Sequence, residues 1–189
     1  MMRPVAMTLV RPAAAHLPSY VEALRSGWSP DTLRPEAATE QLATIEEDAA
    51  GFLAGLEDRD PRGATVTLPD GSRVPRLPWI VRWMWDEGFV GSINLRWQHG
   101  TSELPPRVLG HLGYSVVPGK RRQGHATRAL GLMLGEARAV GLAWVELTAD
   151  PDNAASLRTI ERNGGVLVER FEKALAYGGG PSLRYRIWL

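Results

Sequence analysis

The order of predicted elements places this chain in the α/β class, as a mixed, mostly antiparallel sheet flanked by helices. Strand-like segments occur near both ends of the chain, and helix-like spacing of apolar residues recurs between them. Strands alternate with helices only in the middle, and hairpin patterns dominate elsewhere. The sequence therefore predicts about six or seven strands and about four helices, in one sheet with helices on its faces.

The N-terminal half is predicted to hold two helices and a hairpin. The predicted elements are a strand over residues 5–10, helices over 16–26 and 36–56, and strands over 79–85 and 89–97. Pro35 suits the start of the second helix. Within the loop-rich residues 58–78, the segment TVTLPDGSRVP centres on Asp70-Gly71, which predicts a hairpin turn. A second turn, at residues 86–88, joins the two later strands.

The C-terminal half is predicted to alternate more regularly. The elements are a strand over residues 108–117, a helix over 123–140, a strand over 143–149, a helix over 153–163, and strands over 166–171 and 183–188. Gly164 and Gly165 are placed to end the second of these helices. There is no internal repeat and no linker-like segment, so all 189 residues are expected to form one domain.

Composition and charge limit the classes of function. With 44% hydrophobic residues the chain can bury a core, and with net charge +1 it has no overall attraction for nucleic acid or membranes. It has no cysteine, which excludes a disulfide framework, a thiolate zinc site and a cysteine nucleophile. The four histidines lack metal-ligand spacing, so no metal site is expected. No signal peptide or membrane span is predicted, and a cytoplasmic location is the default expectation.

Charge is unevenly placed along the chain. Residues 36–60 hold eight acids and one base, whereas residues 107–128 hold five bases and no acid. Two solvated faces would explain this pattern. The functional alternative is an anion site in the basic segment, with the acidic segment as a wall that attracts a cation.

The basic segment contains a strand, a glycine-containing loop and the start of a helix, SVVPGKRRQGHATRALGLML. The first turn of a helix has unpaired N–H groups and the positive end of its dipole, so it binds anions. Gly124 lets the backbone approach a bulky phosphate closely. Lys120, Arg121 and Arg122 add positive charge. These features predict a phosphate-bearing ligand at the loop.

The glycine spacing selects among phosphate-binding patterns. A P-loop needs four residues between its glycines and Ser or Thr after the Lys, and neither condition holds around Gly113, Gly119 and Lys120. The dinucleotide pattern G-x-G-x-x-G is also absent. The acetyltransferase pattern Q/R-x-x-G-x-G/A matches RRQGHA at residues 121–126. Farther along, DPDNAAS at residues 150–156 is similar to the N-x-x-S/A motif at a helix start.

On these motifs, residues 110–165 resemble the GCN5-related N-acetyltransferase (GNAT) superfamily, and HLGYSVVPGKRRQGHAT is closest to its RimJ/RimL-like branch. The resemblance implies a GNAT fold with a cofactor-binding core at about residues 107–172 and an acceptor-side part at about residues 1–100. It implies acetyl-CoA as the co-substrate. The implied cofactor-binding residues are Val116, Val117, Arg121, Arg122, Gln123, Gly124, His125, Ala126, Thr127 and Asn153. Asn153 is also explained as a helix N-cap.

The resemblance further implies direct transfer of acetyl from acetyl-CoA to a primary amine of a small molecule or protein. Ser156 is the candidate general acid, because Ile160 stands where many relatives have a Tyr. The candidate bases are His111, on the strand before the loop, Glu146, on the neighbouring strand, and Glu87 and Glu103, in turns. His111 and Ser156 are equally explained as structural residues. Tyr114 is a second candidate donor, with core packing as its alternative.

Candidate acceptor-binding residues lie on the middle hairpin: Trp83, Trp85 and Glu87. Trp83 and Trp85 share a face with Trp79 by strand alternation. They form either part of the core or an aromatic wall for a cationic amine. The acceptor itself stays open, and the resemblance allows a homodimer. The rival interpretation is a catalytically weak GNAT-fold protein that binds acyl-CoA as a sensor or regulatory module.

Overall fold

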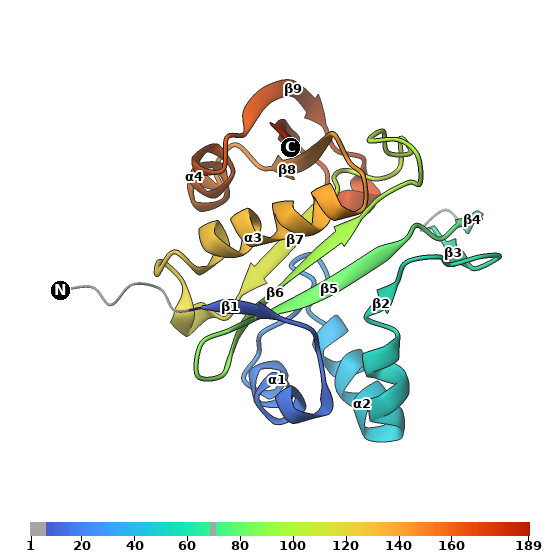
Figure 1. Ribbon diagram of the computed structural model, residues 1–189, viewed down its shortest axis with the longest axis vertical. Helices are drawn as coiled ribbons and strands as arrows, with labels where there is room; N and C mark the ends of the chain where they lie inside the picture. Colours follow the sequence, from blue (N-terminus) through green and yellow to red (C-terminus); the bar gives the residue numbers. More distant parts are fainter. Residues whose placement is uncertain (1–6, 69–70) are drawn as a thin grey trace.

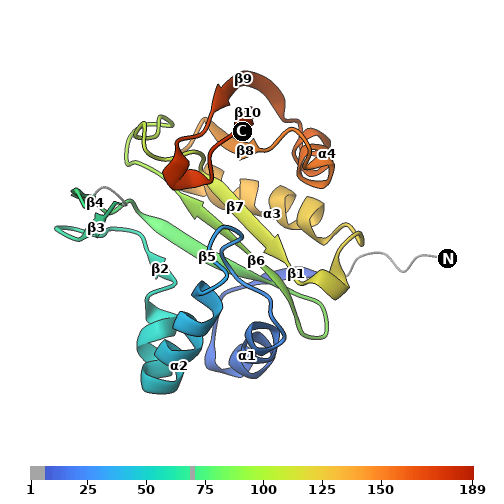
Figure 2. The ribbon, with the colours of Figure 1, turned by 180° about the vertical axis from the view of Figure 1, so that it is seen from behind.

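The structure is a computed structural model that describes residues 7–68 and 71–189. Two antiparallel sheets and four α-helices make up its layers (Figures 1 and 2). The α/β class predicted from the sequence is confirmed. Where one continuous sheet was expected, the strands divide into a larger and a smaller sheet.

The larger sheet is built around a long central hairpin. Its strands are β1 (Thr8–Val10), β2 (Glu57–Asp58), β5 (Trp79–Trp85), β6 (Phe89–Arg96) and β7 (Leu112–Val116). The order is β1-β5-β6-β7, and β2 extends the β1 edge by pairing with the start of β5. A separate hairpin, β3 (Thr65–Thr67) and β4 (Arg73–Pro75), projects beyond the end of this sheet (Figure 1). Asp70, in the predicted turn of that hairpin, lies outside the described residues, as do residues 5–6 of the first predicted strand.

Helices cover both faces of the larger sheet. Figure 1 shows α3 (His125–Ala139) on one face and α1 (Leu17–Arg25) with α2 (Ala37–Ala54) on the other. The predicted helix over residues 36–56 is one element with a break at Asp48, whose carboxylate accepts the Gly51 N–H at 2.8 Å. Each face has its own apolar cluster, because alternate residues of β5 and β6 point to opposite sides.

The smaller sheet has the order β8-β10-β9 and lies beside α3 and α4 (Figure 2). Its strands are β8 (Trp144–Ala149), β9 (Val166–Glu172) and β10 (Pro181–Trp188), and α4 spans Ala154–Arg162. Short 3₁₀ turns η1 (Ala14–His16), η2 (Pro118–Lys120) and η3 (Leu175–Tyr177) interrupt the loops.

The two sheets meet at the start of β7. The His111 N–H donates to the Glu146 carbonyl at 2.8 Å, and the Glu146 N–H donates to His111 Nδ1 at 2.9 Å. A Cβ at Gly110 would lie 2.9 Å from the Glu146 carbonyl oxygen, so glycine permits this close approach. Beyond this junction β7 pairs with β6 and β8 pairs with β10, which leaves the facing edges of β7 and β8 apart.

Within residues 7–68 and 71–189, no helix is long and apolar enough to cross a membrane. The same residues contain no cluster of three or more His, Asp or Glu side chains arranged to hold a metal ion.

Candidate active site

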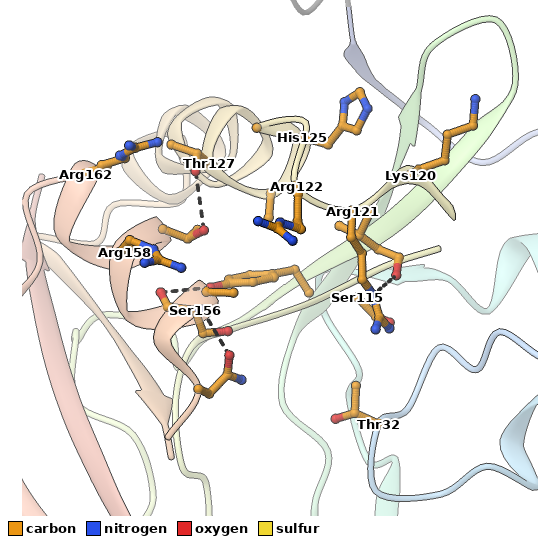
Figure 3. Close-up of a pocket in the computed structure, with 17 residues that line it drawn as sticks. Thr32, Ser115, Lys120, Arg121, Arg122, His125, Thr127, Ser156, Arg158 and Arg162 are labelled. Atoms are coloured by element: carbon orange, nitrogen blue, oxygen red, sulfur yellow. Dashed lines mark hydrogen bonds between the residues drawn. The ribbon is translucent and has the colours of Figure 1, made fainter. Parts of the chain in front are cut away.

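A cavity of about 520 Å³ lies between the end of β7, the loop that leads into α3, and α4 (Figure 3). The lining residues are Thr32, Tyr114, Ser115, Val116, Lys120, Arg121, Arg122, Gly124, His125, Ala126, Thr127, Asn153, Ala155, Ser156, Arg158, Thr159 and Arg162. Eight of the ten residues predicted to bind the cofactor are among them; Val117 and Gln123 are not. The predicted acid Ser156 also lines the cavity.

The loop before α3 has a backbone shape suited to an anion. Arg122 and Gly124 both have left-handed conformations, with φ of 64° and 82°, and α3 begins at the next residue. The first intrahelical bond runs from the Arg128 N–H to the Gly124 carbonyl. The N–H groups of the preceding turn are therefore not used by the helix and are available to a ligand.

Basic side chains reach the cavity from two elements. Figure 3 shows Arg122 from the loop and Arg158 from α4 extending toward the same space, whereas the ends of Lys120 and His125 point away from it. Arg162 lies one turn after Arg158 on α4 and also lines the cavity. The α4 arginines were not predicted, although their spacing of four residues was a usable signal for one helix face.

His125, the first residue of α3, is 3% exposed. Burial lowers the pKa of His125, and Lys120 acts in the same direction, while Asp86 opposes them. A neutral ring at this position supplies no charge to an anion, so the attraction comes from the arginines and the helix N-terminus.

The edge of β7 presents main-chain donors to the gap beside β8. The Val117 N–H donates to Val90 of β6 at 2.9 Å, so it is already used. In an antiparallel pair, successive N–H groups point alternately toward and away from the partner strand. The N–H groups of Tyr114 and Val116 therefore point away from β6, toward the gap. The Val116 carbonyl accepts from Arg121 Nε at 3.0 Å.

The first turn of α4 forms the opposite wall. Asn153 Oδ1 accepts the Ser156 N–H at 3.1 Å, which is N-cap geometry. Thr127 and Thr159 hydroxyls lie 3.3 Å apart and connect α3 to α4. The wall is thus held in place on both sides of Ser156.

Tyr114 places a second hydroxyl beside this turn. Its oxygen lies 3.5 Å from the Ser156 carbonyl oxygen, and the residue lines the cavity. Burial raises the pKa of Tyr114, so its hydroxyl is protonated at neutral pH and available as a donor.

His111 and Glu146 lie outside the cavity lining, at the junction of the two sheets. His111 is fully buried, and burial lowers its pKa to about 4. The two carboxylate oxygens of Glu146 bond to Arg184 at 3.1 Å and Arg186 at 2.8 Å. Neither residue therefore has a free basic atom directed at the cavity. Both instead hold β7 against β8.

The predicted acceptor-binding residues also lie away from the cavity. Trp83 is 0% exposed and stacks on Tyr20 at a ring distance of 4.2 Å, so it belongs to the core beneath α1. Trp85 is half-buried against His16, and Glu87 lies in the β5–β6 turn with a positive φ of 55°. For Trp83 the structure agrees with the alternative interpretation, which is core packing.

Residues that reach the cavity from the acceptor side come instead from the α1–α2 loop. Thr32 lines the cavity from that loop, and Ser115 lines it from β7. Trp28 Nε1 donates to Ser115 Oγ at 3.0 Å, and this hydroxyl lies 3.3 Å from the Ser29 carbonyl. These bonds hold the loop against β7, a long-range contact that no local pattern in the sequence reveals.

Comparison with known families identifies the chain. The family model described as "Acetyltransferase (GNAT) domain" matches residues 7–166, and the chain belongs to this family. It is an acetyl-CoA-dependent N-acetyltransferase, as the sequence motifs predicted. A search of curated protein sequences found no match.

Solved structures share the fold at low sequence identity. The microcin C7 self-immunity acetyltransferase MccE, in complex with acetyl-CoA and AMP, has a TM-score of 0.63 at 13% identity, covering 98% of this chain and 94% of that one. RimL, a ribosomal L7/L12 α-N-protein acetyltransferase in complex with coenzyme A, gives 0.61 at 14%, covering 98% and 96%. RimJ of Mycobacterium smegmatis gives 0.60 at 18%, covering 96% and 81%.

Proposed function

We propose that this chain transfers the acetyl group of acetyl-CoA directly to a primary amine, and that the cavity between β7, the loop before α3, and α4 holds the coenzyme. The observation that carries this proposal is the cavity itself. It combines unused helix N-terminal N–H groups, converging arginines and an unpaired strand edge in one space. The N–H groups and the arginines suit the phosphates of the coenzyme, and the strand edge suits its amide-containing arm and thioester.

The phosphate end is assigned to the loop and α4. The N–H groups of residues 124–127 and the side chain of Arg122 are placed to bind the pyrophosphate. Arg158 and Arg162 add charge from the opposite wall and are assigned to the remaining phosphate of the coenzyme. Guanidinium groups suit this role because they form paired hydrogen bonds with phosphate oxygens.

The arm of the coenzyme is assigned to the edge of β7. The outward N–H groups of Tyr114 and Val116 can bond amide or thioester carbonyls in the manner of an added strand. An N–H directed at the thioester oxygen stabilises the negative charge that develops there when an amine attacks. Val117, whose N–H is occupied, is assigned a packing role.

Two hydroxyls are placed to complete the transfer. The new C–N bond forms as the C–S bond breaks; the attacking nitrogen loses a proton to water, and the departing sulfur takes up a proton. Ser156 and Tyr114 both line the cavity at the first turn of α4, and we assign the proton donor to this pair. Because Ile160 is buried, the place of the Tyr found in many relatives is part of the core here.

The direct test is thiol release from acetyl-CoA in the presence of a panel of amines, beside calorimetric binding of acetyl-CoA. Amine-dependent release is expected. Tyr114→Phe and Ser156→Ala separate the two hydroxyls, and the variant that loses about tenfold or more in kcat at unchanged acetyl-CoA affinity identifies the donor. Acetyl-CoA binding without release for any amine would overturn the proposal and favour an acyl-CoA sensor.

The structural neighbours differ in the kind of acceptor that their descriptions name. MccE is a microcin C7 self-immunity acetyltransferase and RimL a ribosomal L7/L12 α-N-protein acetyltransferase, so both a small molecule and a protein are considered as acceptors here. For this chain the amine is proposed to enter past Thr32 and Ser115, where the α1–α2 loop meets β7.

A further inference from the structure

A row of polar residues lies on the face of β6 and β7 that the α1–α2 loop partly covers. Ser92, Asn94 and Arg96 alternate along β6 and therefore share a face. Ser92 pairs with Ser115 across the strands, and Asn94 lies over Gly113, where a Cβ would be 3.4 Å from the Asn94 side chain. The row is thus continuous between the two strands.

This row begins at the cofactor cavity and leads away from it. Ser115 lines the cavity and contacts the α1–α2 loop through Ser29. Four residues of extended strand separate Ser92 from Arg96, a distance of about 13 Å along β6. A molecule that enters past Thr32 and Ser115 would therefore lie beside Asn94, with Arg96 at its far end.

Arg96 is half-buried and, among the described residues, pairs with no carboxylate, unlike three other arginines of the two sheets. Arg82, Arg184 and Arg186 each pair with a carboxylate within 3.2 Å. Within residues 7–68 and 71–189 no carboxylate forms an ion pair with Arg96, and its one side-chain hydrogen bond goes to the neutral Asn94 Oδ1 at 3.0 Å. A partly buried, unpaired guanidinium is costly in free energy, which points to a missing anionic partner.

Two other groups act on Arg96 electrostatically without bonding to it. Burial lowers the pKa of Arg96, and the nearby Asp31 carboxylate and Tyr177 side chain oppose this effect. Asp31 already accepts the Leu33 N–H at 2.9 Å, and the Tyr177 hydroxyl donates to the Arg107 carbonyl at 2.7 Å. Arg96 stays protonated, and most of its N–H donors are unused.

We propose that the acceptor amine also carries a carboxylate, and that Arg96 binds this carboxylate while the amine reaches the cavity beside Ser115. This inference rests on the proposed acetyl transfer. The planar guanidinium fork matches a carboxylate in a two-bond contact, and the bond to Asn94 fixes the orientation of the fork. Because Arg96 lies at the far end of this row, the carboxylate is several bonds from the amine. It belongs either to the C-terminus or to an acidic side chain of a short peptide.

The test compares matched acceptors in the thiol-release assay. One arm uses the dipeptide Ala-Ala against Ala-Ala-NH₂; the other uses the dipeptide amide Ala-Asp-NH₂ against Ala-Asn-NH₂. In one arm or the other, the carboxylate compound is expected to exceed its amide in kcat/KM by about 30-fold, mainly through KM. The arm that shows the preference identifies the source of the carboxylate.

Variants connect that preference to Arg96. Arg96→Gln is expected to remove the preference and Arg96→Lys to keep part of it, both with unchanged affinity for acetyl-CoA. Arg34→Gln is the matched control, because Arg34 is exposed and pairs with Glu36 and Glu40 away from this row. It is expected to keep the full preference.

The outcomes separate the two proposals. Equal use of acid and amide in both arms, or a preference that survives in Arg96→Gln, overturns the role of Arg96 and leaves acetyl transfer standing. Release of no thiol with any amine overturns the acetyl transfer and this inference with it. The wild-type comparison needs no variant, so it holds even where Arg96→Gln fails to fold.

Discussion

The proposed cofactor side and the proposed acceptor side of this protein are built in different ways. The cofactor side uses one continuous segment, β7 through the start of α3, together with α4, and it offers mainly backbone N–H groups and arginines. The acceptor side brings together the α1–α2 loop, β6 and the loop around η3, which are far apart in the chain.

The difference explains why the cofactor side could be predicted from the sequence and the acceptor side could not. Main-chain recognition needs a particular local backbone path, and glycine and proline spacing records that path. Side-chain recognition across distant elements depends on register and loop packing, which leave no local pattern. Four predictions test this division, from the largest expected effect to the smallest.

Trp83→Ala tests whether the aromatic residues of the acceptor side stabilise the fold rather than bind a ligand. Removing a fully buried indole should lower the free energy of unfolding by about 4 kcal/mol, because the cavity left behind is not refilled. Denaturant unfolding measures this effect. Trp188→Ala, at a site 62% exposed, should cost less than about 1 kcal/mol. Equal effects of the two substitutions would contradict the assignment of Trp83 to the core.

His111 tests the junction that joins the two sides. Its pKa is lowered from 6.5 to about 4, so the unfolded chain binds the proton more readily. The contribution of neutral His111 to the free energy of unfolding is complete above pH 6.5. It is lost as the pH falls toward 4, and the loss is about 3 kcal/mol in total.

Unfolding measured from pH 7 to pH 4 checks the His111 effect. His111→Asn keeps an acceptor for the Glu146 N–H and does not titrate, so its stability should fall less over this range. His99→Asn, at an exposed ring, serves as the control and should follow the wild type. A His111→Asn profile that matches the wild-type profile would rule out this explanation.

Gly124→Glu tests the backbone site on the cofactor side. The residue has a left-handed φ of 82°, and a carboxylate there would repel phosphate. Acetyl-CoA affinity should fall by at least about 100-fold, roughly 2.7 kcal/mol, as measured by calorimetry. Gly119→Ala is the control, since its Cβ would meet open space. Normal binding by Gly124→Glu would refute the proposed phosphate site.

Arg158→Gln tests which phosphate of the coenzyme this arginine binds. If Arg158 binds the 3′-phosphate, the variant should lose about tenfold in affinity for coenzyme A and little for dephospho-coenzyme A. Arg138→Gln, an exposed position at the far end of α3, should change neither. An equal loss for both ligands would place Arg158 at another phosphate.

Much of the architecture was predictable. The hydrophobic periodicity located all four helices and the strands β1 and β5 to β10 to within a few residues, because those elements bury regular apolar faces. The Asp70-Gly71 signal indicated the hairpin that β3 and β4 form, without giving the strand bounds. The strand β2 was missed, since two residues carry no periodic signal. The break in α2 at Asp48 was missed as well, because a capping aspartate within a helix resembles an ordinary exposed acid.

The candidate site residues also divide into those that the sequence located and those that it did not. The loop residues and Ser156 were located by spacing and lie together around the cavity. His111 and Glu146 were chosen as titratable groups near the motif, but a strand position does not reveal whether a side chain faces a cavity or a sheet junction. Their roles, like those of the cofactor residues, remain predictions for the variants above to test.

The sequence by itself determined the elements, the family and the cofactor loop, because each depends on interactions between residues close together in the chain. Tertiary structure alone decided that Trp83 is enclosed, that His111 joins two sheets, and that Arg96 bonds to Asn94 without a carboxylate partner among the described residues. The reason is physical: burial and pairing depend on which distant segments pack together, and the packing of the α1–α2 loop on β7 sets them here.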